Sequence, residues 1–262
     1  MTLLIVVSDG GAEEGLIDSA RGLAVAAGWD VRAVHVRETG GGAGVGDPEG
    51  LELIDLAADS PEDLVKLVSR ADVDCLAVGL RAVDGPGFGP VAEAFLECFS
   101  APLLLVRPDM RALSGLQRLI VPLEGTPSSS AAMLYAEATL CRPGREIMVL
   151  NVVTGHTPAE TGSLPAPRFI DQEQYEWSDW QDEFSMRFSQ CAGGRTHRVS
   201  VRIGDPASTI AREALACEAE LIVLSWSGTF AEGHGCVVRR LLEIAPCPLL
   251  IVPADAGSGP GD

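Results

Sequence analysis

The chain has 262 residues, of which 47% are hydrophobic, and a formal net charge of −18. This length suits two globular units, and the hydrophobic fraction is sufficient to give each unit its own core. The acidic balance argues against nucleic acid and anionic membranes as partners, because both are bound by clustered Lys and Arg. ATP binding is compatible with this acidic charge, since backbone N–H groups and helix N-termini can hold a small phosphate.

The predicted elements alternate along the chain, because short and nearly continuous apolar runs are separated by amphipathic stretches. This is the pattern of buried parallel strands joined by covering helices. In the first half we expect strands near residues 3–8, 31–37, 51–56, 74–79 and 102–106, with helices near 12–27, 61–71 and 90–99. In the second half we expect strands near 118–123, 146–153, 198–203, 220–225 and 248–252, with helices near 128–141, 206–218 and 236–244.

The second half repeats the first. Residues 76–82 recur as 222–228, and residues 103–106 recur as 249–252, both at an offset of 146. The opening residues 4–10 recur as 119–125, at an offset of only 115. We therefore predict two domains, at 1–107 and 118–254, joined by a linker at 107–117 and followed by a flexible tail at 255–262.

The smaller offset at the start means that the second copy carries 31 extra residues, which we place in an insertion at 154–198. Within it, an amphipathic helix is predicted by four aromatic residues at helical spacing, Trp177, Trp180, Phe184 and Phe188. Packing of this aromatic face on the protein itself is favoured over a ligand cage or a partner groove.

Seven cysteines are present, an odd number without a CxxC pair. This usage predicts reduced, mostly buried thiols and neither a disulfide framework nor a zinc site. The apolar run at Thr2–Val7 is too short for a signal peptide or a membrane span, so we expect a cytoplasmic protein.

The candidate site lies in the loops after the first and fourth strands of each half. In an open doubly wound sheet, ligands bind beyond the carboxyl ends of the strands, where the chain order reverses. Glycines there let a backbone approach a phosphate closely. The candidate ligand contacts are Asp9, Gly79 and Gly89 in the first half and Glu124, Ser225, Gly228, Gly235 and Cys236 in the second.

Three motifs of the second half resemble those of universal stress proteins. They are the opening at residues 119–126, the Gly-Asp-Pro-Ala at 204–207 and the closing Ala-Pro-Cys-Pro run at 245–252. The resemblance covers both halves and identifies the chain as similar to a tandem universal stress protein. It implies two Rossmann-like α/β domains of the flavodoxin-like or adenine-nucleotide alpha-hydrolase-like type, each a five-stranded parallel sheet with flanking helices. It also implies that the domains pair through their last strands, at residues 103–106 and 249–252.

ATP-binding members of that family carry a loop of the form G-x-x-G, nine residues, then G followed by Ser or Thr, and an Asp after the first strand. The first half matches at Asp9, Gly79 and Gly89 but has Ala82 at the second glycine and Pro90 at the hydroxyl. Its loop has six residues where the family has nine.

The second half also has the six-residue loop and matches at Gly228 and Gly235. Glu124 stands at the position of the family's Asp, and Ser225 stands at the position of its first glycine. Cys236 stands where the family has Ser or Thr. The first half thus has the better acid, and the second has the better loop before its helix.

Two functional hypotheses stay open. In the first, the chain is a stress-response regulator that binds ATP or ADP in one half. In the second, it is a nucleotide-independent interaction module, in which the glycines only form tight turns and the acidic surface or the insertion recruits a protein partner. Another small ligand in the reshaped pocket is a third alternative, and dimerisation of the whole chain is left open.

We expect no enzyme, since no HExxH, Walker-type GKS or serine elbow occurs. His234 and Cys236 stand close in sequence, but neighbours rarely hold the geometry of a nucleophile pair, and no orienting Asp or Asn can be assigned. Arg239 and Arg240 could add charge near a phosphate, although pairing with carboxylates is their ordinary role.

Overall fold

The computed structural model describes residues 1–8, 14–38, 53–58, 63, 65, 66, 68, 73–80, 90–98, 100–123, 127–154, 196–226 and 234–254. Its strands are β1 (Thr2–Ser8), β2 (Asp30–Glu38), β3 (Leu53–Ala58), β4 (Cys75–Gly79), β5 (Leu103–Val106), β6 (Arg118–Pro122), β7 (Glu146–Val153), β8 (Thr196–Ile203), β9 (Leu221–Trp226) and β10 (Leu249–Pro253). Its helices are α1 (Glu14–Ala27), α3 (Pro90–Cys98), α4 (Pro127–Tyr135), α6 (Pro206–Ala216) and α7 (His234–Ile244), with a π-helical turn, η1 (Ala136–Leu140).

The alternating α/β pattern is confirmed, and each strand begins and ends within two residues of its predicted position. The predicted helix at 128–141 divides into α4 and η1, where the Cys141 N–H donates to the Ala136 carbonyl at 2.9 Å. Of the predicted helix at 61–71, residues 63, 65, 66 and 68 are described and are helical. The predicted helix in the insertion lies outside the described residues.

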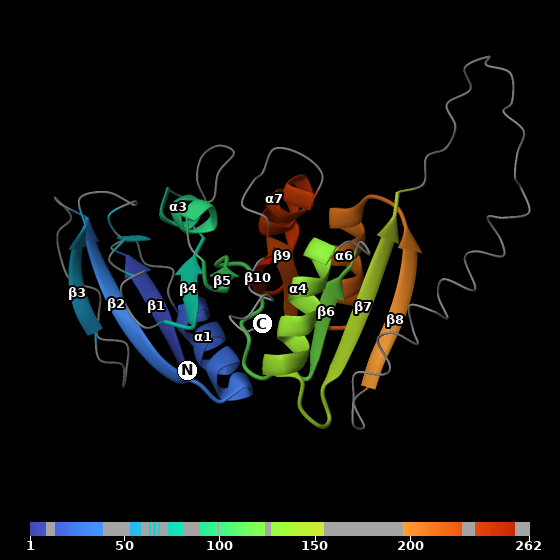
Figure 1. The fold of residues 1–262 in the computed structure, drawn as a ribbon, viewed down its shortest axis with the longest axis horizontal. Helices are drawn as coiled ribbons and strands as arrows, with labels where there is room; N and C mark the ends of the chain where they lie inside the picture. The colour runs from blue at the N-terminus through green and yellow to red at the C-terminus, as the bar shows by residue number, and fades with distance from the viewer. Residues whose placement is uncertain are drawn as a thin grey trace, which may run out of the picture.

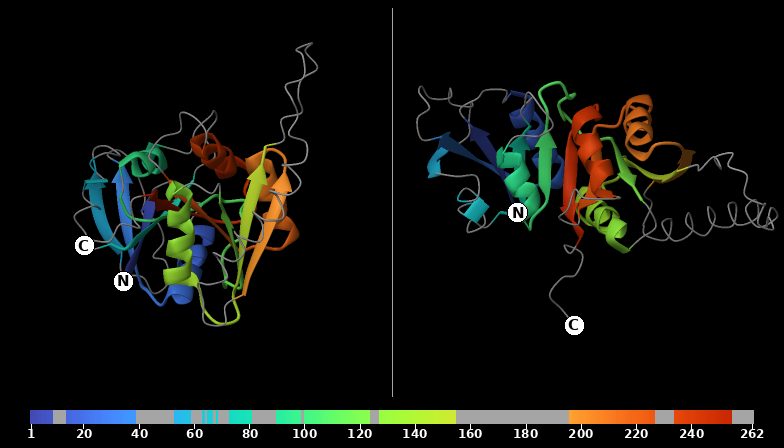
Figure 2. Two further views of the ribbon diagram at one scale, coloured as in Figure 1. Left: turned by 45° about the vertical axis from the view of Figure 1, so that its right-hand side comes forward. Right: turned by 90° about the horizontal axis from the view of Figure 1, so that it is seen from above.

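The strands form one continuous sheet with the order β3-β2-β1-β4-β5-β10-β9-β6-β7-β8. Pairing is parallel within each half and antiparallel only between β5 and β10, where the last strands meet as the resemblance implied (Figure 1). Leu104 pairs with Leu250, and these two residues are equivalent at the repeat offset of 146. A pseudo-twofold axis therefore passes through this pair, with one half on each side of the junction (Figure 2).

Two hydrophobic clusters fill the molecule, but each is shared by both halves, which corrects the expectation of one core per half. Along β1, Leu4 and Val6 belong to one cluster, while Leu3 and Ile5 belong to the other. Because successive side chains of a strand point to opposite faces, the clusters lie on the two faces of the sheet. Helices α3, α6 and α7 cover one face, and α1 and α4 cover the other (Figure 1).

Helix ends of one half are capped by side chains from elsewhere in the chain. Arg145, which precedes β7, donates to the Ala26 carbonyl at the end of α1, at 2.9 Å. Arg107, in the linker, donates to the Leu242 and Ala245 carbonyls at the end of α7, at 2.7 and 3.0 Å. The last carbonyls of a helix lack intrahelical partners and carry partial negative charge, so guanidinium groups stabilise these ends. These contacts tie the linker and both halves into one body.

The described cysteines form no disulfide. Cys75, Cys141 and Cys247 are buried and Cys217 is partly buried, as the usage predicted, whereas Cys98 and Cys236 are exposed. None of the helices that can be described has the length and apolarity to cross a membrane. Within the same part of the chain, no cluster of three His, Cys, Asp or Glu has metal-binding geometry.

Candidate functional site

The chain order reverses between β1 and β4 in the first half and between β6 and β9 in the second. These are the switch points at which open α/β sheets bind ligands, beyond the carboxyl ends of the strands. In Figure 1 the arrowheads of β2, β3, β7 and β8 point toward the same upper side of the molecule. The two carboxyl edges therefore open on one side, with α3 and α7 between them.

Gly79 ends β4 at the switch point of the first half, next to β1. Its backbone does not have the positive φ that would require glycine, since the positive-φ glycines among the described residues are Gly28, Gly144 and Gly204. A Cβ on Gly79 would lie 3.5 Å from the Leu16 Cδ2, which is ordinary van der Waals contact. Neither conformation nor packing among the described residues therefore requires a glycine at this strand end.

Ser225 occupies the equivalent position in the second half, at the repeat offset of 146. It pairs with Val252 in the sheet, and only 3% of its surface is exposed. The same backbone position thus accepts a Cβ and a hydroxyl. The first half leaves this space to a glycine, while the second half fills it with a buried side chain.

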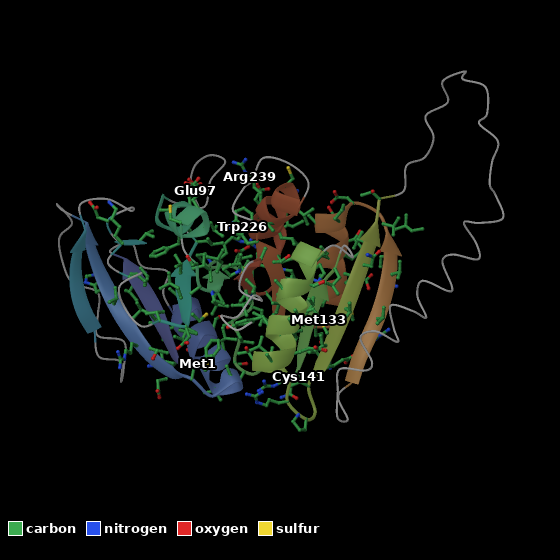
Figure 3. The ribbon with its side chains drawn as sticks, viewed as in Figure 1. Met1, Glu97, Met133, Cys141, Trp226 and Arg239 are labelled. Atoms are coloured by element: carbon green, nitrogen blue, oxygen red, sulfur yellow. The ribbon has the colours of Figure 1, made fainter. Side chains whose placement is uncertain are left out.

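Trp226 follows Ser225 and points away from its own half. Its side chain is 5% exposed, and its Nε1 donates to the carbonyl of Leu96 in α3 at 2.6 Å. In Figure 3 it lies between α3 and α7. The equivalent residue in the first half is Leu80, which is buried and whose backbone N–H donates to the Val106 carbonyl of the same half at 2.7 Å.

The helices after the two loops start differently. Pro90 is the first residue of α3, so that helix start lacks one N–H donor. In α7 the second and third residues are Gly235, which is buried, and Cys236, which is exposed. On the same helix, Arg240 forms an ion pair with Glu243, the ordinary role expected of it.

Asn151 borders the candidate site of the second half and was not predicted from the sequence. It lies in β7, only 7% exposed, and its Nδ2 donates to the Leu123 carbonyl at 2.8 Å. Leu123 directly precedes Glu124. The amide therefore fixes the backbone that leads into the position of the candidate acid. The available signal was a polar residue inside an apolar strand, because buried polar groups are held by hydrogen bonds.

The Gly-Asp-Pro-Ala motif has a structural role. Asp205 caps α6, where its Oδ1 accepts from the Ser208 backbone N–H at 2.9 Å. Hydrogen bonds from the side chain and backbone of Ser208 lower the pKa of the Asp205 carboxyl below its ordinary value of 3.8. Gly204 has φ +151°, and a Cβ there would lie 2.8 Å from the Thr209 Oγ1, so glycine is required.

Four of the candidate contacts are described: Gly79 in the first half, and Ser225, Gly235 and Cys236 in the second. The structure thus assigns them to two separate edges. The remaining candidates, Asp9, Gly89, Glu124 and Gly228, lie outside the described residues. Their contact with a ligand stays a prediction, as it does for the four described residues.

Comparison with known proteins agrees with this architecture. The model of the Universal stress protein family matches residues 115–253. A universal stress protein from Archaeoglobus fulgidus DSM 4304 superposes with a TM-score of 0.60 at 14% identity, covering 95% of this chain and 96% of its own. A functionally unknown protein from Pseudomonas aeruginosa PAO1 superposes with a TM-score of 0.64 at 11% identity, covering 96% of this chain and 92% of its own. These structures share the fold over nearly the full chain.

Proposed function

Since the chain belongs to the universal stress protein family, we propose that it is a nucleotide-responsive stress regulator that holds one ATP or ADP at the carboxyl edge of its first half. The protein acts by binding and not by catalysis, and it does so in the cytoplasm, where thiols remain reduced. Nucleotide occupancy changes which protein partner it engages.

Gly79 is the observation that carries the assignment to the first half. A glycine that neither its backbone conformation nor its packing against the described residues explains is expected where a ligand must approach the backbone closely. Asp9 follows β1 directly in the sequence, and its contact with the nucleotide remains the prediction made from the family resemblance. At the equivalent place in the second half, the buried Ser225 already occupies this space.

Two exchanged substitutions test the assignment. Gly79→Ser gives the first half the residue of the second, and Ser225→Gly does the reverse. Because a Cβ at Gly79 would make only an ordinary contact with Leu16, the first variant should fold. We expect titration calorimetry to show ATP binding weakened at least about tenfold by Gly79→Ser, a loss of 1.4 kcal/mol or more, and unchanged by Ser225→Gly. Loss from Ser225→Gly alone would instead place the nucleotide in the second half.

A nucleotide-independent interaction module is the second candidate. Pro90 favours it, because a proline at the start of α3 removes an N–H that a phosphate could use. Under this alternative the wild-type protein gives no heat with ATP, and both exchanged variants behave as the wild type does.

A further inference from the structure

The two outermost strands of the second half, β7 and β8, share an apolar face. Val149 in β7 belongs to the hydrophobic cluster on the α4 side of the sheet, and its register partner Val199 in β8 packs against that cluster. Alternate residues of a strand point to the same face. Val201 and Ile203 therefore follow Val199 on this face, and Val153 follows Val149 and pairs with Ile203. The outer apolar face is formed by these residues: Val153, Val199, Val201 and Ile203.

The described residues cover this outer apolar face only in part. Its three valines are partly buried, and Ile203 is 71% exposed. On the opposite face of β8, the Arg202 Nε donates to the Oε1 of Glu213 in α6 at 3.0 Å. Helices α4 and α6 lie on opposite sides of the strands of the second half, as the right-hand view of Figure 2 shows, and α4 packs on β6, β9 and β10. The outer apolar face thus lies beyond the strands on which α4 packs.

The direction of each crossover decides which face of the sheet its helix covers. Steps away from the β5–β10 junction, from β1 to β2 and from β6 to β7, pass through α1 and α4 on one face. Steps toward the junction pass through α3, α6 and α7 on the other. This is the outcome of right-handed crossovers between parallel strands. The connection from β7 to β8 also joins parallel strands and steps away from the junction, so it crosses the sheet on the α4 face.

The connection from β7 to β8 is the insertion of the second half, residues 154–195. It leaves β7 at the carboxyl edge and enters β8 at the opposite edge, so it travels the length of β8, about 26 Å for eight residues. About eight extended residues would span this distance. The insertion is long enough to include the predicted aromatic helix at 177–188, which would measure about 18 Å.

We propose that the outer apolar face is the docking site of this aromatic helix of the same chain. Its four aromatic residues pack on the valines and on Ile203, and so remove from water the apolar surface of both partners. The tether at both ends of the insertion favours this occupant over a second copy of the chain, because binding within one chain has a high effective concentration. The aromatic residues then belong to the core of the second half, and a protein partner is recruited elsewhere. This inference does not depend on nucleotide binding.

Acrylamide quenching of tryptophan fluorescence in the full-length protein tests the docking. The chain has four tryptophans, and Trp29 and Trp226 are buried, so accessibility to acrylamide reports chiefly on Trp177 and Trp180. We expect weak quenching in the wild type. Ile203→Asp places a charge on the outer apolar face and should raise the quenching constant toward that of the urea-unfolded protein.

Leu215→Asp is the matched control, because Leu215 is 68% exposed and lies on α6, on the opposite face. Its quenching constant should equal that of the wild type. The docking is overturned if the wild type is already quenched as strongly as the unfolded protein, or if Ile203→Asp and Leu215→Asp have the same quenching constant.

A photo-crosslink identifies the occupant directly and does not require that Ile203→Asp folds. Ile203→p-benzoylphenylalanine places the crosslinker on the outer apolar face, at an exposed position. After irradiation, peptide mass spectrometry should find an adduct within one chain, between position 203 and residues 177–188, and no such adduct from the same substitution at Leu215. A crosslink to a second copy, or to any other segment in place of 177–188, overturns the inference. Neither experiment uses ATP, so their failure leaves the proposed function standing.

Discussion

Gly22 in α1 lies against the backbone of Leu113 in the linker, so closely that a Cβ on Gly22 would overlap the Leu113 carbonyl oxygen. Three residues earlier on the same helix, the Ser19 Oγ accepts the Leu113 N–H at 3.1 Å, with both residues fully buried. Both backbone groups of Leu113 therefore face α1. The linker is docked on the first half by a small residue and a hydroxyl.

This contact predicts opposite effects for the same substitution at two places in α1. Gly22→Ala should lower the free energy of unfolding by about 1–3 kcal/mol, because the linker or the helix must shift. Gly15→Ala is the control, since a Cβ at Gly15 meets none of the described residues within 4 Å, and it should raise that free energy by about 0.5–1 kcal/mol. Urea titration of both variants measures the difference. A neutral or stabilising Gly22→Ala contradicts the docking of Leu113.

The shared clusters predict that the two halves unfold together. Each face of the sheet buries residues of both halves, such as Leu4 with Ile120 on one face and Leu3 with Leu119 on the other. We expect a single calorimetric transition whose calorimetric and van't Hoff enthalpies agree. Two transitions, each assigned to one half by hydrogen exchange, would contradict a common core.

The cap on α6 predicts a pH-dependent contribution to stability. The folded-state pKa of Asp205 is depressed below its ordinary 3.8, so the unfolded chain binds a proton first as the pH falls. The stabilisation is present above pH 3.8 and is lost as the pH falls through the folded pKa. Asp205→Ala should cost about 1 kcal/mol at pH 7, and the difference from the wild type should shrink below pH 3.8.

Asp205→Asn is the control for this prediction, because its amide oxygen can still accept the Ser208 N–H but does not titrate in this range. At pH 7 the free energy of unfolding of Asp205→Asn should differ from that of the wild type by less than that of Asp205→Ala does. Urea midpoints measured between pH 2 and pH 7 compare the three proteins. Equal pH profiles for the wild type and Asp205→Ala contradict the cap.

The cysteines predict selective alkylation. The thiolate is the reactive form, and it must also be accessible. Burial raises the pKa of the Cys247 thiol to about 12 and also raises that of Cys75, whereas Cys98 and Cys236 are exposed. Iodoacetamide at pH 8 should therefore modify Cys98 and Cys236 before the other cysteines that the structure describes. Peptide mass spectrometry checks this order, and early labelling of Cys75 or Cys247 disagrees with their burial.

Most of the fold could be predicted from the repeat in the sequence. The offset of 146 aligned residues 103–106 with 249–252, and the family resemblance implied that these last strands pair, as they do through Leu104 and Leu250. The division of the hydrophobic residues between the two clusters could not be predicted from the repeat. A strand buried on both faces is apolar at every position, so Leu3 and Leu4 look alike in sequence although they enter different clusters.

Less of the candidate site than of the fold could be predicted from the sequence. Gly79 and Ser225 were found because they end apolar runs of the sequence, but the contact of a Cβ at Gly79 with Leu16 depends on a helix distant in the chain. The partner of Trp226 is 130 residues away, and no local pattern indicates it. Asn151 could have been noticed as a polar residue within a strand, whereas its bond to Leu123 required the register of β7 on β6.

The stoichiometry of ATP binding to the full chain is the most decisive test of a single nucleotide site in the first half. The sample is first freed of bound nucleotide by denaturation and refolding and is then titrated with ATP in a calorimeter. We predict one ATP per chain, with micromolar affinity corresponding to roughly −8 kcal/mol. Two equivalent sites, or no binding, would contradict a single nucleotide held by the first half.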